Sequence, residues 1–350
     1  MKSYSRQSYN LLNSLRETVE REALISSADH IICALSGGLD SVMLLYFLLY
    51  YKKQLDFKLT ACHLHHGIRG LTADEDESFV RELCLQAEVG LDVRHADVPA
   101  LAAEENLSLE AAGRMARHDF FRDLIRKYSP STAGSCRIAL AHHADDAVET
   151  FLLNLGRGSG SRGVSSMRIA DGYIIRPLLE TREADLRKIA LAESISWRED
   201  ETNLSPEFLR NRIRHQLLPL WSELVAYDVS PVLLRYIGTV RENEDYLNRQ
   251  AEEALKKACL PDNSLSSVII ADLDPAIQKR SLLLYLEKYY KDELDTDQAD
   301  ISNAHLTAVC ASIQEAVYGD KKQRRHYLPQ AVVAEIAESR ILLLKNERLC

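Results

Sequence analysis

Six residues near the start of the chain, Ser36 to Ser41, have the composition of a phosphate-binding turn. They read SGGLDS and lie between an apolar run and a stretch with helical apolar spacing. Glycines let the backbone approach an anion closely, and the N–H groups that open a helix point at the same place. The lysine of a Walker loop and the third glycine of a dinucleotide loop are both missing from this turn. We therefore expect a phosphate site of another kind, against the alternative of a strand-to-helix turn with a serine cap.

Carboxylates gather at a second place, where Asp145, Asp146 and Glu149 fall close together at a predicted helix start. They could be ordinary helix-capping residues. Beside a phosphate loop they could instead complete a Mg²⁺ site or position a nucleophile. His63, His65 and His66 are expected to be hydrogen-bonded loop residues rather than metal ligands, because a Mg–ATP site prefers oxygen ligands.

Alternating strands and helices must position these turns. This alternation predicts an α/β fold with a doubly wound, Rossmann-like parallel sheet, whose ligands lie beyond the carboxyl ends of the strands. Each polar turn follows a predicted strand, so we expect the turns to meet at one edge of the sheet. The predicted strands cover residues 30–35, 57–64, 91–98 and 137–141, and the predicted helices cover 5–26, 40–49, 74–87, 108–127 and 146–155.

The second half of the chain begins with a flexible, positively charged loop at 157–163, followed by a predicted strand at 174–179 and a helix at 182–193. Arg210 and Arg214 then lie at a helical spacing and can share a face. We place a domain boundary near 219–227, which divides the chain into residues 1–218 and 219–350. The second domain is expected to be smaller and mainly helical, with helices at 231–258, 276–290 and 302–317, a short strand at 267–271 and a terminal β-hairpin at 324–344.

Composition limits the classes of protein that fit. The chain has 350 residues, of which 46% are hydrophobic and 27% charged, as is usual for a globular protein of two or three domains. Its seven cysteines form no CxxC pair, which indicates reduced thiols in the cytoplasm. No apolar run reaches the roughly 18 residues that a membrane span needs, so no membrane partner is expected.

Charge gives a mixed indication of nucleic-acid binding. The formal net charge of −9 is unlike that of a generic nucleic-acid-binding domain, which is usually basic. A compact basic run at 321–326 could nevertheless contact a phosphate backbone, or it could be solvated surface.

An ordered series of motifs resembles the bacterial tRNA(Ile)-lysidine synthetases, which are N-type ATP pyrophosphatases of the PP-loop superfamily. The series runs from about residue 28 to 220, and the later helices with LPQAVV resemble that family's first C-terminal domain. Ala147 stands where the family commonly has Gln, and Gly113 where Ala is commoner. The second C-terminal domain of longer members is expected to be absent. The motifs are SGGLDS, HLHHGIRG, SLEAAGRMAR, AHHADDAVETFLLNLGRGSG, IIRPLL, WREDETN and FLRNRIRHQLLP.

This resemblance implies an ATP-dependent, AMP-forming ligase. Such an enzyme adenylates the C2 oxygen of the wobble cytidine in an isoleucine tRNA with a CAU anticodon, and then joins free L-lysine to C2. The implied cofactors are ATP, as co-substrate, and Mg²⁺, and the implied partners are tRNA and L-lysine. A homodimer is left open, and the enzyme is expected in the cytoplasm.

The resemblance also implies roles for individual residues. The residues implied for ATP binding are Ser36, Gly37, Gly38, Leu39, Asp40, Ser41, His63 and Arg114. The residues implied for Mg²⁺ are Asp40 and Asp146, and those implied for catalysis are Asp40, Asp146, Glu149, Arg114 and Arg214. Lysine binding is expected at Glu110 and Asp145. Those expected to bind tRNA are Arg117, Arg157, Arg210, Lys321, Lys322, Arg324 and Arg325. The arginines could instead form surface ion pairs, and Glu110 could serve only the helix dipole.

Three other functions are weighed against this one. A 2-thiolation enzyme of the iron–sulfur kind would carry paired CxxC motifs, which this chain lacks. An amidotransferase-coupled synthetase would share SGGLDS but not the RGSG and RNRIR segments. A tRNA-binding module without chemistry would keep the phosphate loop but would need no carboxylate cluster.

Overall fold

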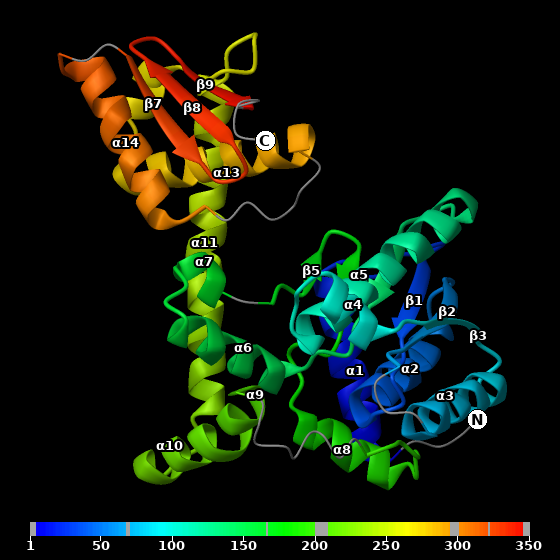
Figure 1. Cartoon of the computed structure of the whole chain (residues 1–350). Helices are drawn as coiled ribbons and strands as arrows, with labels where there is room; N and C mark the ends of the chain where they lie inside the picture. Colours follow the sequence, from blue (N-terminus) through cyan, green and yellow to red (C-terminus); the bar gives the residue numbers. More distant parts are fainter. Residues whose placement is uncertain are drawn as a thin grey trace. The chain divides into compact units, whose positions relative to one another are not determined.

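The computed structural model describes residues 5–67, 71–165, 167–199, 209–294, 301–320 and 323–345. Contacts divide the chain into two compact units, Met1–Ile237 and Gly238–Cys350, which are considered separately (Figure 1). This division falls inside a continuous helix, α11 (Ser230–Ala258), where the sequence has no break that could mark it. The domain limits 1–218 and 219–350 remain a prediction.

The first unit is built on a six-stranded sheet with the order β3-β2-β1-β4-β6-β5. All neighbours are parallel except β5 and β6, which are antiparallel. The expected doubly wound parallel sheet is therefore confirmed. The strands are β1 (His30–Ala34), β2 (Lys58–His65), β3 (Gly90–His95), β4 (Cys136–Ala139), β5 (Ala170–Asp171) and β6 (Ile174–Ile175).

The strand predicted at 174–179 is much shorter in the structure. It ends at Ile175, and the chain then turns, with Leu179 N–H bonded to the Arg176 carbonyl and Thr181 N–H to the Leu178 carbonyl. Pro177 has no N–H to donate to a ladder, so the apolar residues after it are buried without being part of the sheet.

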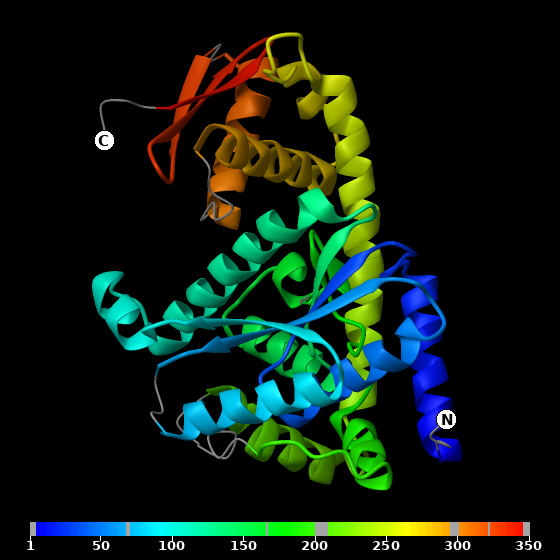
Figure 2. The same ribbon diagram turned by 90° about the vertical axis from the view of Figure 1, so that its right-hand side faces the viewer.

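Helices cover both faces of this sheet because its central strand is apolar on both sides. Ile31 and Cys33 of β1 face a core that includes α1, α2, α3 and α8, whereas Ile32 faces the core formed by α5. In Figure 2, α5 and α3 lie on opposite sides of the strands. The helices of this unit are α1 (Arg6–Arg21), α2 (Leu39–Lys52), α3 (Leu71–Gln86), α4 (Val98–Glu104), α5 (Leu109–Tyr128), α6 (Ala144–Gly156), α7 (Ser161–Val164), α8 (Glu183–Ala192), α9 (Leu209–Arg212) and α10 (Leu218–Val225), with a π-helical turn at Ile213–Leu217 and a 3₁₀ turn at Ser129–Ser131.

The second unit places helices against a three-stranded antiparallel sheet, in which β8 is central (Figure 1). Its core joins side chains of the helices to those of the strands, including the fully buried Tyr290. The expected mainly helical domain is confirmed, but the predicted terminal hairpin has a third strand. Besides α11, the elements are α12 (Ser267–Ala271), α13 (Pro275–Leu294), α14 (Asn303–Tyr318), β7 (Gln323–Leu328), β8 (Val332–Ala337) and β9 (Ile341–Lys345).

The predicted strand at 267–271 is wrong, because these residues form the short helix α12. Ser266 caps this helix by accepting a hydrogen bond from the Ile269 N–H. The amides of Gln278 and Gln314 donate to the carbonyls of Ile270 and Ala271 at its end. These bonds satisfy the ends of a helix whose β-branched residues, taken alone, favour a strand.

Within the described residues, we find no single helix with the length and apolar character of a membrane span. Two consecutive helical segments, Leu209–Val225 and Ser230–Ala258, together have the length and composition of a span, but the chain bends by 102° between them.

Candidate active site

The SGGLDS turn joins the end of β1 to the start of α2, as the sequence predicts. Gly37 adopts φ +96°, which L side chains rarely adopt, and a Cβ there would lie 3.4 Å from the ring of Phe79. The N-cap of α2 is Gly38, which provides no side-chain cap. The amide dipoles at the start of α2 are therefore directed at the cavity beside the turn, where an anion would be stabilised.

The hydroxyl of Ser41 holds the turn together from inside. It accepts hydrogen bonds from the N–H groups of Ser36 and Gly37, each at 3.2 Å, and donates to the Gly38 carbonyl at 2.9 Å. Below the turn, His63 Nδ1 donates to the Leu35 carbonyl at 2.8 Å, and burial lowers the pKa of His63. Both residues thus support the turn, and His63 is not among the residues that line the cavity.

A cavity of about 370 Å³ opens between the turn and the start of α6. One part of its wall is apolar, including Phe120, Phe121 and Leu140, and another part carries charges of both signs. The structure therefore brings the phosphate turn and one carboxylate of the second cluster, Asp146, to one cavity. The predicted residues that line it are Ser36, Gly38, Leu39, Asp40, Ser41, Arg117, Asp146 and Arg214.

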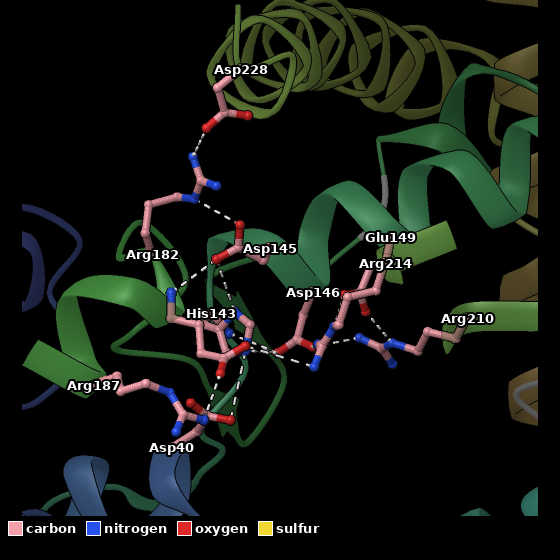
Figure 3. A network of polar contacts seen from close by, with 11 residues as sticks. Asp40, His143, Asp145, Asp146, Glu149, Arg182, Arg187, Arg210, Arg214 and Asp228 are labelled. Carbon is pink, nitrogen blue, oxygen red and sulfur yellow. Dashed lines mark hydrogen bonds and ion pairs between the residues drawn. The ribbon is translucent and has the colours of Figure 1, made fainter. Parts of the chain in front are cut away.

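A buried histidine lies at the centre of the carboxylates (Figure 3). His143 is 1% exposed, and its Nε2 atom lies 3.6 Å from Asp40 Oδ2 and 3.5 Å from Asp146 Oδ2. Its Nδ1 atom lies 3.7 Å from Asp145 Oδ2 and has no hydrogen-bond partner in the described structure. His143 thus links the end of the phosphate turn to the start of α6.

Asp40 is the least compensated of these carboxylates. Its Oδ1 atom is buried and finds no hydrogen-bond donor among the described residues. Burial, assisted by the negative charges of Asp146 and Glu183, raises the pKa of Asp40 to about 6. Asp146 differs: burial acts to raise its pKa, but His143 and Arg210 outweigh burial and lower it.

These two carboxylates fit a hard divalent cation. Asp40 and Asp146 offer oxygen atoms on one cavity wall, and one of those oxygens is buried without a partner. Oxygen ligands are those that Mg²⁺ prefers, and a bound cation would offset the burial of the charge.

Two arginines hold the carboxylates of α6 from the other side (Figure 3). Arg210 donates to Glu149 Oε2 at 2.5 Å and to Asp146 Oδ1 at 2.6 Å. Arg214 donates to Glu149 Oε1 and lies 3.5 Å from Asp146 Oδ1. Because Glu149 is fully buried, this pairing compensates its charge and fixes its position.

Several predicted site residues do not line the cavity. Asp145 receives hydrogen bonds from Arg182 Nε at 2.7 Å and from the Glu183 N–H at 2.9 Å, so it caps α8. Glu110 and Arg114 are exposed on the first turns of α5, and Arg157 is exposed at the end of α6.

The basic run of the second unit is only partly described. Arg324 and Arg325 lie on β7 and form ion pairs with Glu315 and Glu335. Lys321 and Lys322 fall outside the described residues.

The structure adds residues for which the sequence motifs indicate no role. His143 could have been found from its place in the HHADD motif, and Arg198 and Glu199 from the WREDETN motif. Glu183 and Arg187 belong to no motif. The backbone N–H of Arg198 donates to the Gly37 carbonyl at 2.9 Å. This bond holds the chain around Arg198 against the phosphate turn. The added cavity residues are Glu183, Arg187, Arg198 and Glu199.

Residues 5–221 match the PP-loop domain family. Among curated proteins, the tRNA(Ile)-lysidine synthase of Clostridium acetobutylicum is 34% identical over 250 residues, which cover 71% of this chain and 53% of that protein. The synthase of Chlorobaculum tepidum is 34% identical over 240 residues, covering 69% and 71%. That of Geobacter sulfurreducens is 32% identical over 328 residues, covering 92% and 66%.

Among solved structures, the U34-tRNA thiolase NcsA of Methanococcus maripaludis, with its [4Fe-4S] cluster, superposes with a TM-score of 0.55. It is 17% identical and covers 67% of this chain and 80% of that one, so the likeness concerns the fold alone. The chain spans between about half and two thirds of the length of the relatives from Clostridium acetobutylicum, Clostridium perfringens and Geobacter sulfurreducens.

Proposed function

This chain belongs to the tRNA(Ile)-lysidine synthase family of PP-loop proteins, and we propose that it is a tRNA-modifying ligase of that activity. It would use ATP to adenylate the C2 oxygen of the wobble cytidine in the CAU anticodon of an isoleucine tRNA, and then join L-lysine to C2. The observation that carries this proposal is the convergence of the phosphate turn with Asp40 and Asp146 in one cavity.

The phosphates of ATP would lie against the SGGLDS turn. There the dipole of α2 and the closely approaching backbone of Gly37 and Gly38 favour negative charge. Asp40 and Asp146 would hold Mg²⁺, which when bound neutralises phosphate charge and polarises the α-phosphate. Arg214, on the cavity wall, would stabilise the negative charge that develops as pyrophosphate leaves. Arg114 and His63 are proposed for ATP from the family resemblance, His63 through its support of the turn.

Glu149 would act by holding Arg210 and Arg214 in place, since both its oxygens accept from these side chains. The ammonium group of lysine needs a carboxylate that faces the cavity. Glu183 lines the cavity and is 28% exposed, and its contacts with Arg187 and Arg214, at 3.3 and 3.7 Å, are longer than the 2.7 Å bond that holds Asp145. Glu110 and Asp145, expected for this role, remain proposals, but Asp145 is already held by Arg182.

For tRNA we propose contacts from the arginines expected to bind it. Arg117 lines the cavity and Arg157 is exposed, so both can meet a backbone phosphate. Arg210 pairs with Asp146 and Glu149, which favours a positioning role over a tRNA contact. We also propose that the protein acts in the cytoplasm, and a homodimer is left open.

The rival 2-thiolation activity is not favoured. Cys33, Cys62 and Cys84 are buried, and burial raises their pKa values, so these thiols are poorly suited to hold a cluster as thiolates. Among the residues described, no three cysteines bring their sulfur atoms within 4.8 Å of one another.

Mass spectrometry of tRNA treated with the protein, ATP, Mg²⁺ and lysine tests the proposed function. The modified RNA should gain the mass of lysine less water, and omission of lysine should abolish this gain. Incorporation of sulfur or ammonia instead would assign the chain to another activity on the same ATP site.

A further inference from the structure

Two histidines stand side by side at the carboxyl ends of neighbouring strands. His65 is the last residue of β2 and His95 the last of β3, and the two are register partners in the parallel ladder. Their rings stack with centroids 4.6 Å apart and planes 14° apart. The strand pairing therefore brings the two imidazoles together.

Helix α3 adds carboxylates to this pair. Glu77 Oε2 lies 2.9 Å from His95 Nε2, while Arg81 holds the other oxygen, Oε1, at 2.8 Å. Asp74, one helical turn earlier, places Oδ1 3.2 Å from His65 Nε2. One ligand atom from each of His65, Glu77 and His95 lies within 4.8 Å of the others.

We propose that His65, Glu77 and His95 bind a transition-metal dication of the Zn²⁺ or Co²⁺ type, with Asp74 beside His65 as a nearby carboxylate outside this group of three ligand atoms. Two imidazoles with a carboxylate are a donor set that such ions favour, whereas Mg²⁺ favours oxygen alone. None of the four residues lines the ATP cavity, so this is a second site.

Burial around the cluster suits an ion that enters from solvent. The side chains of His65 and Glu77 are 9% and 13% exposed, which gives two fixed ligands, and His95 is 63% exposed, which leaves a way in. Arg81 fixes the orientation of Glu77 as an outer-shell partner. A bound ion would tie β2, β3 and α3 together.

Without metal, the same contacts are ordinary hydrogen bonds, and metal binding must displace them. The Gly67 N–H donates to His65 Nδ1 at 3.3 Å, so Nε2 carries the ring proton and donates to Asp74. Ligation at Nε2 moves the ring proton to Nδ1 and breaks the Gly67 bond. This loss weakens binding by roughly five- to tenfold, so we expect a moderate affinity.

The test uses the full chain, stripped with EDTA and titrated with Co²⁺ while its visible absorption is recorded. An Asp40→Asn background removes a ligand of the ATP site. We expect saturation near one equivalent, displacement of Co²⁺ by Zn²⁺ but not by excess Mg²⁺, and a higher melting temperature with Zn²⁺. Loss of a residue that only orients a metal ligand costs about 10- to 100-fold in metal affinity. His95 and Glu77 would be ligands themselves, so His95→Ala and Glu77→Gln should each lower the affinity for Co²⁺ at least tenfold.

Glu82→Gln is the matched control, because Glu82 is exposed on the same helix and bonds only to Gln86 among the contacts described. It should bind Co²⁺ like the parent protein. His95→Ala alters a mostly exposed side chain and should fold normally, which far-ultraviolet circular dichroism can verify. Absence of saturable binding in the parent, or equal binding by the parent and His95→Ala, would overturn the proposal.

Discussion

The surroundings of Asp40 favour the binding of a cation more than the stability of the free protein. Its buried Oδ1 lacks a donor in the described structure, and its pKa of about 6 means that it is mostly ionised at neutral pH. Ionising a carboxyl that has a buried oxygen without a hydrogen-bond donor destabilises the folded state. Such a position is typical of a site whose compensation comes from a bound cation.

We therefore predict opposite effects of Asp40→Asn on activity and stability. Pyrophosphate release should be lost, because an amide cannot supply the charge that holds Mg²⁺. The free energy of unfolding should rise by about 1 kcal/mol at pH 7.5. This figure allows for solvent screening, since the Asp40 side chain is 36% exposed.

The size of the stability effect depends on pH. The pKa of Asp40 is raised from 3.8 to about 6, so its contribution to stability is full below 3.8 and is lost as pH rises through 6. Denaturant unfolding at pH 5 and pH 7.5 should show the gap between variant and parent opening as pH rises. Unchanged pyrophosphate release in a folded variant would contradict the assignment of Asp40.

Glu183 gives a separate prediction about lysine. Glu183→Gln removes a negative charge from the cavity wall, so the KM for lysine should rise about tenfold while the KM for ATP changes little. Steady-state kinetics with each substrate varied in turn measures both values. A matching rise in the KM for ATP would mean that Glu183 acts only through Arg214.

At the residue scale, the sequence identified groups that form local patterns and missed those that the fold brings in from elsewhere. Asp40 and Asp146 belong to compact motifs, so their types and spacing indicated a site. Glu183 and Arg187 lie on α8 without such a pattern, and only the path of the chain after β6 brings them to the cavity. Asp145 and Asp146 are adjacent residues of the same type, yet Asp146 lines the cavity whereas the Asp145 carboxylate caps α8.

At the scale of elements, the prediction was reliable wherever apolar spacing and length agreed. The strands near 30, 58, 91 and 137 alternate with helices in the structure as expected. The failure at 267–271 concerns five residues, too few for periodicity to separate a strand from a helix. The third strand, β9, was missed as a separate element because pairing across two turns is not a local property of the sequence.

Two carboxylates of α6 hold the segment 209–217, and Glu149 is the fully buried one. Glu149→Gln would leave Arg210 and Arg214 with Asp146 as their remaining shared anion, which should cost roughly 1–3 kcal/mol of stability because both arginines are partly exposed. Hydrogen exchange should become faster in residues 209–217 than in the sheet. Asp185→Asn, at a 52% exposed carboxylate that pairs with Lys188 on α8, should lose less than about 1 kcal/mol and serves as the control. Equal exchange in both variants would mean that other contacts hold this segment.

At the scale of the whole molecule, a chain of net charge −9 with the proposed function would need local basic surfaces to bind an anionic RNA. We predict that neutralising Lys321, Lys322, Arg324 and Arg325 raises the KM for tRNA and flattens its salt dependence. The rate at saturating tRNA should change little. Each lost phosphate contact should reduce the double-logarithmic salt slope by roughly 0.7–0.9.

The expected change in slope is smaller than four contacts would give, because Arg324 and Arg325 already pair with Glu315 and Glu335. Filter binding over a range of salt concentrations measures it. Neutralising Lys256 and Lys257, in the last turn of α11, is the matched control. An unaltered slope in the 321–325 variant would identify that run as solvated surface.

The order of the two chemical steps is the last prediction. The C2 oxygen is a poor leaving group, and it becomes a good one when it attacks the α-phosphate, forms an O–P bond and releases pyrophosphate. The ε-amino group of lysine can then attack C2, forming the C–N bond as the C–O bond to AMP breaks, and a cavity carboxylate can accept the proton that the amine loses. Without lysine, label from α-labelled ATP should therefore appear on the tRNA, and added lysine should release it as AMP. Pyrophosphate release that requires lysine, with no labelled tRNA in its absence, would show that adenylation does not come first.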